Sequence, residues 1–347
     1  MNIEHLRHAA QIADEAVKNG PQPTAVIAVA DRDTTLWTHV SPGEDGVSLD
    51  SIFLIASITK PVVATAIMRL VEEGNLLLNV PVATYLPEFG ANNKEHVTSW
   101  HLLTHSSGLE EDQYWGELQA LTTPPPPGFL YNAACSSYLH FDPGTAYQYN
   151  SLTFSVLSEL IARLGGEPYP DYLRRHIFEP LGMTSTAFSP VDPARAAPIY
   201  DLGPPHVVAG FTSLAMPGGG LWSSAADLVA FGQAYLRGGT TAGGYKLLSP
   251  PSISLMTQHY THGQKQFVSG TSFNYGLGWG KPSSPRDGDL LASERAFGHN
   301  GASGTTLWID PQYGFVYVFL SNRWDMVDPL LTSARGLNVV YGAVDGA

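Results

Sequence analysis

Residues 55–61, with the sequence IASITKP, constrain this chain more than any other segment. They place a hydroxyl and an amine three residues apart at the head of an apolar run that ends at Gly74. Because residues i and i+3 share one face of a helix, Ser57 and Lys60 would lie side by side. Pro61 lacks an N–H, so regular helix should begin within a residue or two of Ser57. The segment predicts a buried helix with a glycine C-cap, whose positively polarised N-terminus holds a candidate nucleophile.

Lys60 is the candidate base for Ser57, provided that its surroundings lower the pKa of its amine. A free lysine has a pKa of about 10.4, so acting as a base near pH 7 requires a shift of roughly 3 units, about 4 kcal/mol. Burial supplies such shifts, and a nearby phenol can share the proton. Tyr149 is the candidate phenol, because it follows a Pro143-Gly144 turn and precedes a helical pattern. The alternative is that Ser57 merely caps a helix.

The composition excludes several functional classes. A chain of 347 residues with 44% hydrophobic content can bury a large core. Its 18 Lys and Arg residues against 31 Asp and Glu residues give a net charge of -13, which repels nucleic acid and anionic membrane surfaces. The single cysteine, Cys135, excludes an internal disulfide framework and a Cys-x-x-Cys motif.

The N-terminus predicts an amphipathic helix. Apolar side chains in residues 1–20 recur on one helical face, without the continuous apolar core of a signal peptide. No later stretch is long enough to span a bilayer. We therefore expect a cytoplasmic location, with no membrane or nucleic-acid partner.

Strand patterns gather near both ends of the chain. Residues 25–30 and 35–40 read as one hairpin, and residues 306–309 and 315–320 as another, while a last helix is expected over 329–341. Strands at the ends and helices in the middle predict an α+β fold. In this fold an antiparallel sheet flanked by helices is built from both termini, with a mainly helical region inserted.

The expected regions meet near residues 74 and 268. Residues 1–74 and 269–347 would form the α/β region, and residues 75–268 the mainly helical region with the substrate loops. Residues 152–164 show helical spacing, and Ser224 reads as the N-cap of another helix. An irregular interval over 110–145, rich in aromatics, is expected to form a lid or binding wall, or a loop packed on itself.

Six short segments together resemble the serine β-lactamase and penicillin-binding-protein superfamily. The resemblance is strongest to the class C-like branch, which includes DD-peptidases, and closest to family VIII carboxylesterases. The segments span nearly the whole chain and follow the family order: residues 55–60, 102–109, 143–151, 178–183, 218–224 and 298–301. This resemblance implies the β-lactamase/DD-peptidase-like fold.

The resemblance also assigns roles at matching positions. Ser57 would be the acylated nucleophile and Lys60 would help to deprotonate it. Tyr149 matches the tyrosine of the family's Tyr-x-Asn motif, a general base in acylation and a proton donor to the leaving group.

The third family motif corresponds to His299, Asn300 and Gly301, where the lactamases have Lys-Thr-Gly and the esterase-like branch often has His-x-Gly. Backbone N–H groups of Ser57 and Ala302 would form the oxyanion hole.

Two departures from the family pattern point away from lactams and DD-peptides. Ser151 replaces the asparagine of Tyr-x-Asn, an amide that commonly contacts the amide side chain of a substrate. His299 replaces a lysine, which removes a permanent cation that would attract a β-lactam carboxylate. Both changes leave the acylation groups in place.

Other candidate residues have simpler explanations. His105 is expected to be mainly structural, and Asp227 reads as a helix cap. His259 and His262 lack an acidic partner at metal-ligand spacing, so no metal is expected. No Gly-x-Ser-x-Gly elbow, phosphate loop or dinucleotide fingerprint occurs, so no cofactor is expected.

These observations predict a serine hydrolase, foremost a carboxylesterase acting on small to medium esters. An amide-directed relative is the alternative, either a D-aminopeptidase, an amidase or a weak β-lactamase, and an acyltransferase is a related possibility. A non-catalytic binding protein on this scaffold forms the third class.

Overall fold

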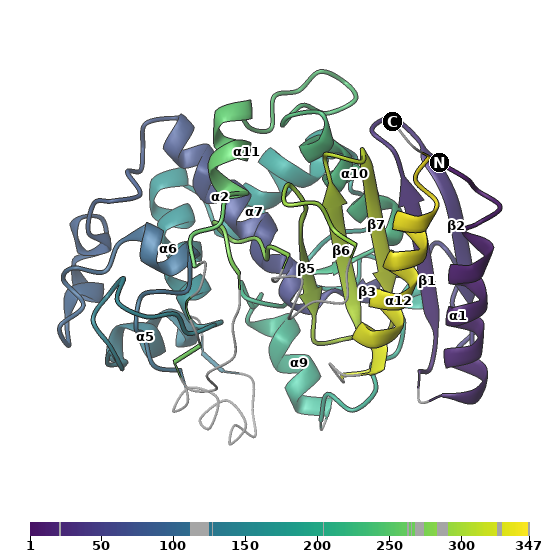
Figure 1. Ribbon diagram of the computed structural model, residues 1–347. Helices are drawn as coiled ribbons and strands as arrows, with labels where there is room; N and C mark the ends of the chain where they lie inside the picture. The colour runs from purple at the N-terminus through teal and green to yellow at the C-terminus, as the bar shows by residue number, and fades with distance from the viewer. Residues whose placement is uncertain are drawn as a thin grey trace.

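The computed structural model contains a five-stranded antiparallel sheet, which lies in the right half of Figure 1. The structure describes residues 1–20, 22–111, 125–126, 128–203, 205–261, 264, 266–267, 274–282, 291–324 and 328–345. In order across the sheet, the strands are β2 (Thr35–Ser41), β1 (Ala25–Ala30), β7 (Phe315–Leu320), β6 (Thr305–Asp310) and β5 (Phe297–Gly301). The predicted hairpins are therefore confirmed, and β1 pairs with β7 to join the two ends of the chain.

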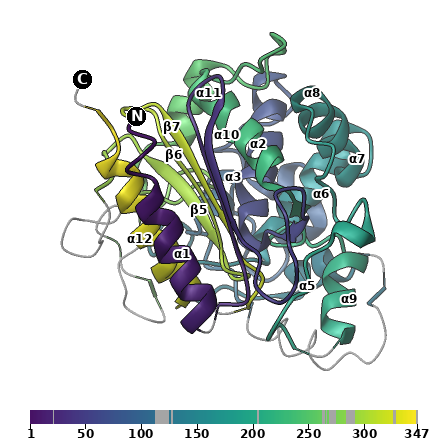
Figure 2. The same cartoon turned by 90° about the vertical axis from the view of Figure 1, so that its right-hand side faces the viewer.

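The sheet is covered on both faces, as alternate side chains of β7 show. Phe315, Tyr317 and Phe319 point into a cluster with α1 (Arg7–Asn19) and α12 (Asp328–Gly342). The alternate residues Val316, Val318 and Leu320 belong to the main core on the opposite face. Successive strand residues point to opposite faces, so a strand buried on both sides must be apolar throughout. Figures 1 and 2 show α1 and α12 packed together against the sheet.

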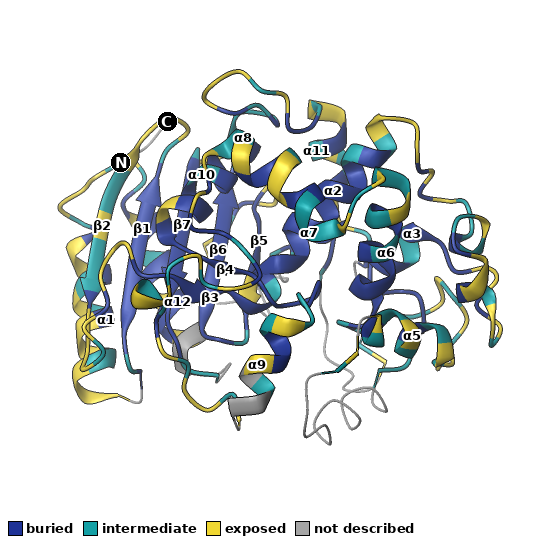
Figure 3. Ribbon diagram, turned by 180° about the vertical axis from the view of Figure 1, so that it is seen from behind, coloured by how far each residue is buried: buried dark blue, intermediate teal, exposed yellow. Residues whose placement is uncertain are grey.

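The opposite face carries helices from the middle of the chain. Helix α10 (Ala225–Leu236) packs on β1, β6 and β7, and α2 (Thr59–Glu72) packs against α6 (Thr153–Gly165). Figure 3 shows these strands and helices largely buried, with exposed residues on loops and on the outer helices. The other α-helices in the described residues are α3 (Ser99–Leu103), α5 (Phe129–Ser136), α7 (Tyr169–Leu173), α8 (Glu179–Leu181), α9 (Pro205–Ser213) and α11 (Pro250–Met256).

Helix α2 follows the sequence prediction closely. A short 3-10 turn, η1 (Ala56–Ile58), leads into α2 at Thr59, and Gly74 adopts a φ of 76° just after the helix ends. A left-handed φ at this place is the usual glycine termination. A second, two-stranded sheet pairs β3 (Phe53–Leu54) with β4 (Trp222–Ser223) and fixes the chain just before η1.

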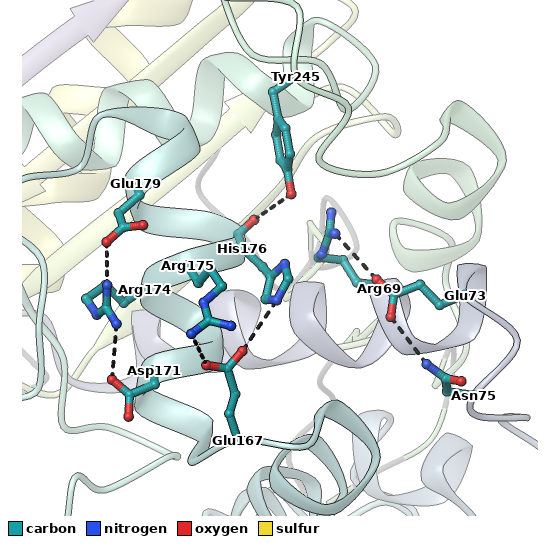
Figure 4. Close-up of polar contacts among 10 residues, drawn as sticks. All are labelled: Arg69, Glu73, Asn75, Glu167, Asp171, Arg174, Arg175, His176, Glu179 and Tyr245. Atoms are coloured by element: carbon teal, nitrogen blue, oxygen red, sulfur yellow. Dashed lines mark hydrogen bonds and ion pairs between the residues drawn. The ribbon is translucent and has the colours of Figure 1, made fainter.

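Polar contacts on the surface link α2 to the α7–α8 region (Figure 4). The Arg69 guanidinium lies 5.6 Å from the ring centroid of Tyr245, whose hydroxyl donates to the His176 carbonyl at 3.3 Å. Glu167 pairs with Arg175 at 3.2 Å and His176 at 3.5 Å. Ion pairs near the protein surface contribute about 0 to 1 kcal/mol each, so the buried core holds these helices in place.

The interval expected to be irregular, residues 110–145, contains helix α5, so that prediction was wrong in part. The run FLYNAACS is apolar enough to pack a helix, and Gly128 precedes it with a φ of 77°. Tyr114 and Trp115, two aromatic residues of this interval, lie outside the described residues, as do His262 and the join near residue 268. The division into two regions stays a prediction. None of the helices described is long and apolar enough to cross a membrane.

Candidate active site

Ser57 and Lys60 meet at the start of α2, as their spacing predicts. The Lys60 Nζ lies 3.1 Å from the Ser57 Oγ, 3.1 Å from the Ser151 Oγ and 2.6 Å from the Gly218 carbonyl oxygen. The Lys60 side chain is fully buried. Three segments far apart in the sequence therefore converge on one amine.

Burial changes the acid–base character of Lys60. Desolvation lowers its pKa from 10.5 to about 7, and the negative charge of Glu111 opposes this shift. A charged amine loses much of its hydration inside a protein, so the neutral form gains relative stability. Lys60 can therefore exchange a proton near neutral pH, which is the property that a base for Ser57 requires.

Tyr149 lies just before α6, beside both of these groups. Its hydroxyl is hydrogen-bonded to Ser57, and the Lys60 Nζ lies 4.8 Å from the centroid of its ring. Burial raises the pKa of Tyr149 well above its usual value, while the Ser57 hydrogen bond acts in the opposite direction. Tyr149 therefore keeps its proton at neutral pH and can donate it.

His105 packs against the segment that contains Tyr149. Its Nδ1 accepts a hydrogen bond from the backbone N–H of Asn150 at 3.1 Å, and its ring centroid lies 4.4 Å from that of Tyr149. His105 also adopts a left-handed φ of 57°. Burial lowers the pKa of His105 well below its usual value, so its imidazole is neutral. These contacts fit the structural role that the sequence predicts.

His299 carries no charge and has no free ring nitrogen. Its Nδ1 lies 2.7 Å from the Asn300 carbonyl oxygen, which can only accept, so Nδ1 bears the proton. The Nε2 then accepts from the Tyr275 hydroxyl at 2.8 Å. Burial lowers the pKa of His299 to about 3, with a smaller contribution from the Lys60 charge. The position that holds a lysine in the lactamases thus offers no cation here.

Side chains of the β5–β6 turn and of the first residue of β6 form hydrogen bonds with the segment before Ser57. Ala302 is the first residue of this turn. The Ser303 Oγ donates to the Leu54 carbonyl at 2.5 Å, and the Thr305 Oγ1 donates to the Ile55 carbonyl at 3.1 Å. These hydrogen bonds hold the turn that contains Ala302 against the segment that leads into Ser57. The two N–H groups predicted to form the oxyanion hole therefore lie on segments that are bonded to each other.

Close packing explains the glycine of the His-Asn-Gly segment. A Cβ at Gly301 would lie 2.4 Å from the Ile55 carbonyl oxygen and 3.2 Å from the Ala56 Cβ. Ala56 itself adopts a φ of 45°, a conformation that costs a non-glycine residue about 1 to 3 kcal/mol. Its carbonyl accepts from the Thr59 hydroxyl at 2.7 Å. The backbone beside Ser57 is therefore held in a strained form by its neighbours.

The remaining predicted residues have clear places. Asn300 is exposed, and its side-chain oxygen accepts from the Thr306 hydroxyl at 3.1 Å. Asp227 lies in the first turn of α10, but its carboxylate accepts from the Ser185 N–H and the Thr186 hydroxyl instead of capping that helix. The cap itself is Ser224. Within the described part of the chain, no group of three or more His, Cys, Asp or Glu side chains is placed to hold a metal.

Three further residues of the site, Gly218, Glu111 and Tyr275, were not predicted from the sequence to make the contacts found here. Gly218 lies in a Gly-Gly-Gly run, and a Cβ there would lie 2.9 Å from the Ser151 carbonyl oxygen. Such a run signals close backbone approach, but it does not identify the partner. No sequence signal marked Glu111 or Tyr275, because their contacts join segments distant along the chain.

The amino-acid sequence of this chain is similar to those of several curated proteins. PbpX of Bacillus subtilis (strain 168) is 32% identical over 232 residues, which cover 65% of this chain and 53% of PbpX. Esterase EstB of Burkholderia gladioli is 34% identical over 183 residues, which cover 46% of this chain and 44% of EstB. The match thus spans about half the length of each of these relatives.

Solved structures show the same fold. A penicillin-binding protein homologue from Caulobacter crescentus superimposes with a TM-score of 0.83 at 21% identity, covering 99% of this chain and 98% of the homologue. A family VIII carboxylesterase superimposes with a TM-score of 0.80 at 19% identity, covering 98% and 97%. The protein family described as Beta-lactamase matches residues 9–338, which include all six motif segments. The chain therefore belongs to the beta-lactamase family, with the β-lactamase/penicillin-binding-protein fold.

Proposed function

We propose that this chain is a serine hydrolase that cleaves small to medium carboxylic esters through an acyl-enzyme on Ser57. The observation that carries the proposal is the contact of the Ser57 Oγ with both the Lys60 amine and the Tyr149 phenol. An amine with a pKa of about 7 serves as a base near neutral pH. A buried phenol with a raised pKa serves as the proton donor.

The proposed reaction begins when neutral Lys60 takes the Ser57 hydroxyl proton and the Oγ bonds to the ester carbonyl carbon. The carbonyl electron pair moves onto oxygen, and the N–H groups of Ser57 and Ala302 stabilise the resulting oxyanion. When this intermediate collapses, the bond to the alcohol oxygen breaks and Tyr149 gives that oxygen its proton. The proton held by Lys60 then restores Tyr149, and water attacks the acyl-enzyme by the same route.

The electrostatics of His299 favour an ester over an anionic lactam or peptide. Its neutral imidazole commits one nitrogen to Asn300 and the other to Tyr275, so it offers no cation for a substrate carboxylate. The Ser151 hydroxyl is engaged by Lys60 and replaces an amide that would contact an amide substrate. The similarity to EstB, which is named an esterase, adds support.

An amide-directed hydrolase is the second candidate, either a D-aminopeptidase, an amidase or a weak β-lactamase. Amide cleavage requires a protonated leaving nitrogen, and the buried Tyr149 hydroxyl is a proton donor at the right place. If amides are the substrates, Tyr149→Phe should reduce their turnover far more than that of activated esters. Nitrocefin, D-amino-acid p-nitroanilides and p-nitrophenyl esters, assayed side by side, separate the two candidates.

The deciding experiment is a burst assay with p-nitrophenyl butyrate. Wild-type protein and the control Ser213→Ala should release p-nitrophenol, whereas Ser57→Ala should not. Intact-mass spectrometry should find a butyryl group on Ser57, and added alcohols reveal acyl transfer as new ester products. Equal activity in Ser57→Ala overturns the proposal. Folded protein whose Ser57 is inert to a fluorophosphonate would instead favour a binding role.

A further inference from the structure

A carboxylate that no sequence motif marks lies beside the candidate site. We propose that Glu111 is a positioning residue for the hydrolysis, which fixes the Ser151 backbone against Lys60 and presents a negative charge to that amine. This inference rests on the proposed function, and it assigns Glu111 no contact with substrate.

The first part of the inference comes from hydrogen bonding. The Glu111 Oε2 accepts from the backbone N–H of Ser151 at 2.6 Å and from that of Leu152 at 3.0 Å. The first N–H groups of a helix have no intrahelical partner, and the N-cap residue Leu152 has no capping side chain. The Asn150 Oδ1 accepts the next N–H, that of Thr153, at 2.9 Å. Glu111 thus completes the cap of α6 from a segment 40 residues away.

Helix capping alone would be a structural role, but Ser151 connects this cap to the reacting groups. Its backbone N–H binds Glu111, while its Oγ lies 3.1 Å from the Lys60 Nζ. Tyr149 lies two residues earlier in the same segment and contacts Ser57. A displacement of this short segment would move two groups together: the Ser151 hydroxyl, which accepts from Lys60, and Tyr149, the proposed proton donor.

The second part comes from charge. Among the described residues, the titratable side chains that act on Lys60 or respond to its charge are Glu111, Tyr149, His105 and His299. Burial keeps both histidines and the tyrosine neutral. The charge of Glu111 therefore acts against desolvation and favours the protonated amine. The same charge raises the pKa of Tyr149 and helps to keep its proton in place.

Removing the charge should therefore extend activity to lower pH. Without the carboxylate, the pKa of Lys60 falls further, so the neutral base persists in more acidic solution. Glu111→Gln keeps an oxygen that can accept from Ser151 and Leu152 but loses the charge. Glu111→Asp keeps the charge but shortens the reach by one methylene. The two variants thus separate the electrostatic role from the positional role.

The test is the pH dependence of kcat/KM for p-nitrophenyl butyrate in these two variants, with Glu110→Gln as the matched control. For Glu111→Gln we expect the acid limb to move down by about one pH unit with little change in the plateau. For Glu111→Asp we expect an unchanged midpoint and a plateau lowered on the order of tenfold. The control Glu110→Gln should match wild type, because Glu110 is not among the charges that shift the pKa of Lys60.

Failure of this inference is distinguishable from failure of the proposed function. If wild type is active and Ser57→Ala is inactive, but Glu111→Gln and Glu111→Asp both follow the wild-type profile, Glu111 only caps α6 and the inference is overturned. If no ester is cleaved, the same variants are compared by the pH dependence of Ser57 labelling with a fluorophosphonate. An unshifted labelling profile in Glu111→Gln likewise overturns the electrostatic role.

Discussion

The Lys60 Nζ lies 2.6 Å from the Gly218 carbonyl oxygen, closer than it lies to the Ser57 Oγ at 3.1 Å. A neutral amine has two N–H donors and one lone pair. The Gly218 carbonyl can only accept, and the Ser151 hydroxyl can take the second N–H. The lone pair is then left for the Ser57 hydroxyl proton, so the two other acceptors orient the base.

Ser151→Ala should therefore impair the base without removing it. The substitution leaves one Lys60 donor unpaired in a buried site, which costs about 1 to 3 kcal/mol, and the amine is less well oriented. We expect kcat to fall on the order of tenfold with little change in KM. The measurement is steady-state kinetics on a p-nitrophenyl ester. The buried control Ser155→Ala, one turn along α6, should keep wild-type kinetics. A raised KM at constant kcat would instead identify Ser151 as a substrate contact.

The pH profile should report the titration of Lys60. Its pKa of about 7 means that the neutral base forms as the pH rises, so kcat/KM should increase through pH 7 to a plateau. Initial rates between pH 5 and 9 at fixed ionic strength test this. Lys94, a second buried lysine, has a pKa lowered to about 8 and binds the Cys135 and Ser137 carbonyls. Lys94→Met should leave the midpoint unchanged. A midpoint near 4 would indicate a carboxylate base.

Local patterns carried most of what the sequence predicted correctly. The contact between Ser57 and Lys60 follows from helical spacing, and the helix boundary follows from Pro61 and Gly74. Hairpins are also local, because their two strands are neighbours in the chain. The approach of Tyr149 to Ser57 is not local, and only the resemblance to a known family predicted it.

The unpredicted part of the site depends on tertiary contacts. Gly218 reaches Lys60 across 158 positions, and Glu111 reaches Ser151 across 40. Neither contact leaves a periodic pattern in the sequence. The sequence does show a histidine at position 299, but its tautomer and neutrality follow from the Tyr275 hydroxyl and from burial, which appear only in the folded chain.

Lys60 should reduce the stability of the fold at neutral pH. Its folded pKa of about 7 lies below the usual 10.5, so between these values the unfolded state binds a proton that the folded state lacks. Lys60→Met should raise the free energy of unfolding at pH 7 by roughly 1 to 3 kcal/mol, with loss of activity. This gain in the free energy of unfolding is smaller than the free energy that corresponds to the full pKa shift of Lys60. The reason is that the Gly218 carbonyl and the Ser151 hydroxyl lose their hydrogen-bond donor in the variant.

The sign of this effect gives a second readout. The Lys60 amine makes the free energy of unfolding of the wild-type protein rise as the pH increases from 7 towards 10.5. Lys60→Met has no such amine, so the difference in the free energy of unfolding between the two proteins should become smaller over this range. Urea unfolding at pH 7 and pH 9.5 measures it. A methionine variant that is less stable at both pH values would show that the hydrogen bonds of Lys60 outweigh its desolvation.

Gly301→Ala should damage the proposed oxyanion site more than the fold. The new Cβ would lie 2.2 Å from the Thr305 Oγ1 and 2.4 Å from the Ile55 carbonyl oxygen, so β5 must move away from the segment before Ser57. That movement separates the N–H groups of Ser57 and Ala302. Loss of one such donor costs a factor of about 100 to 1,000 in kcat, and we expect a fall of that order.

The control for this substitution is a glycine with room for a methyl group. Gly210 lies in α9, and among the described residues a Cβ there meets no atom within 4 Å apart from the backbone of its own helix. Gly210→Ala should keep wild-type kcat and gain up to about 1 kcal/mol, because alanine favours helix over glycine. Burst kinetics and thermal melts on both variants separate catalysis from stability. Wild-type kcat in folded Gly301→Ala would contradict the assignment of the Ala302 N–H to the oxyanion hole, since the donor would then tolerate displacement.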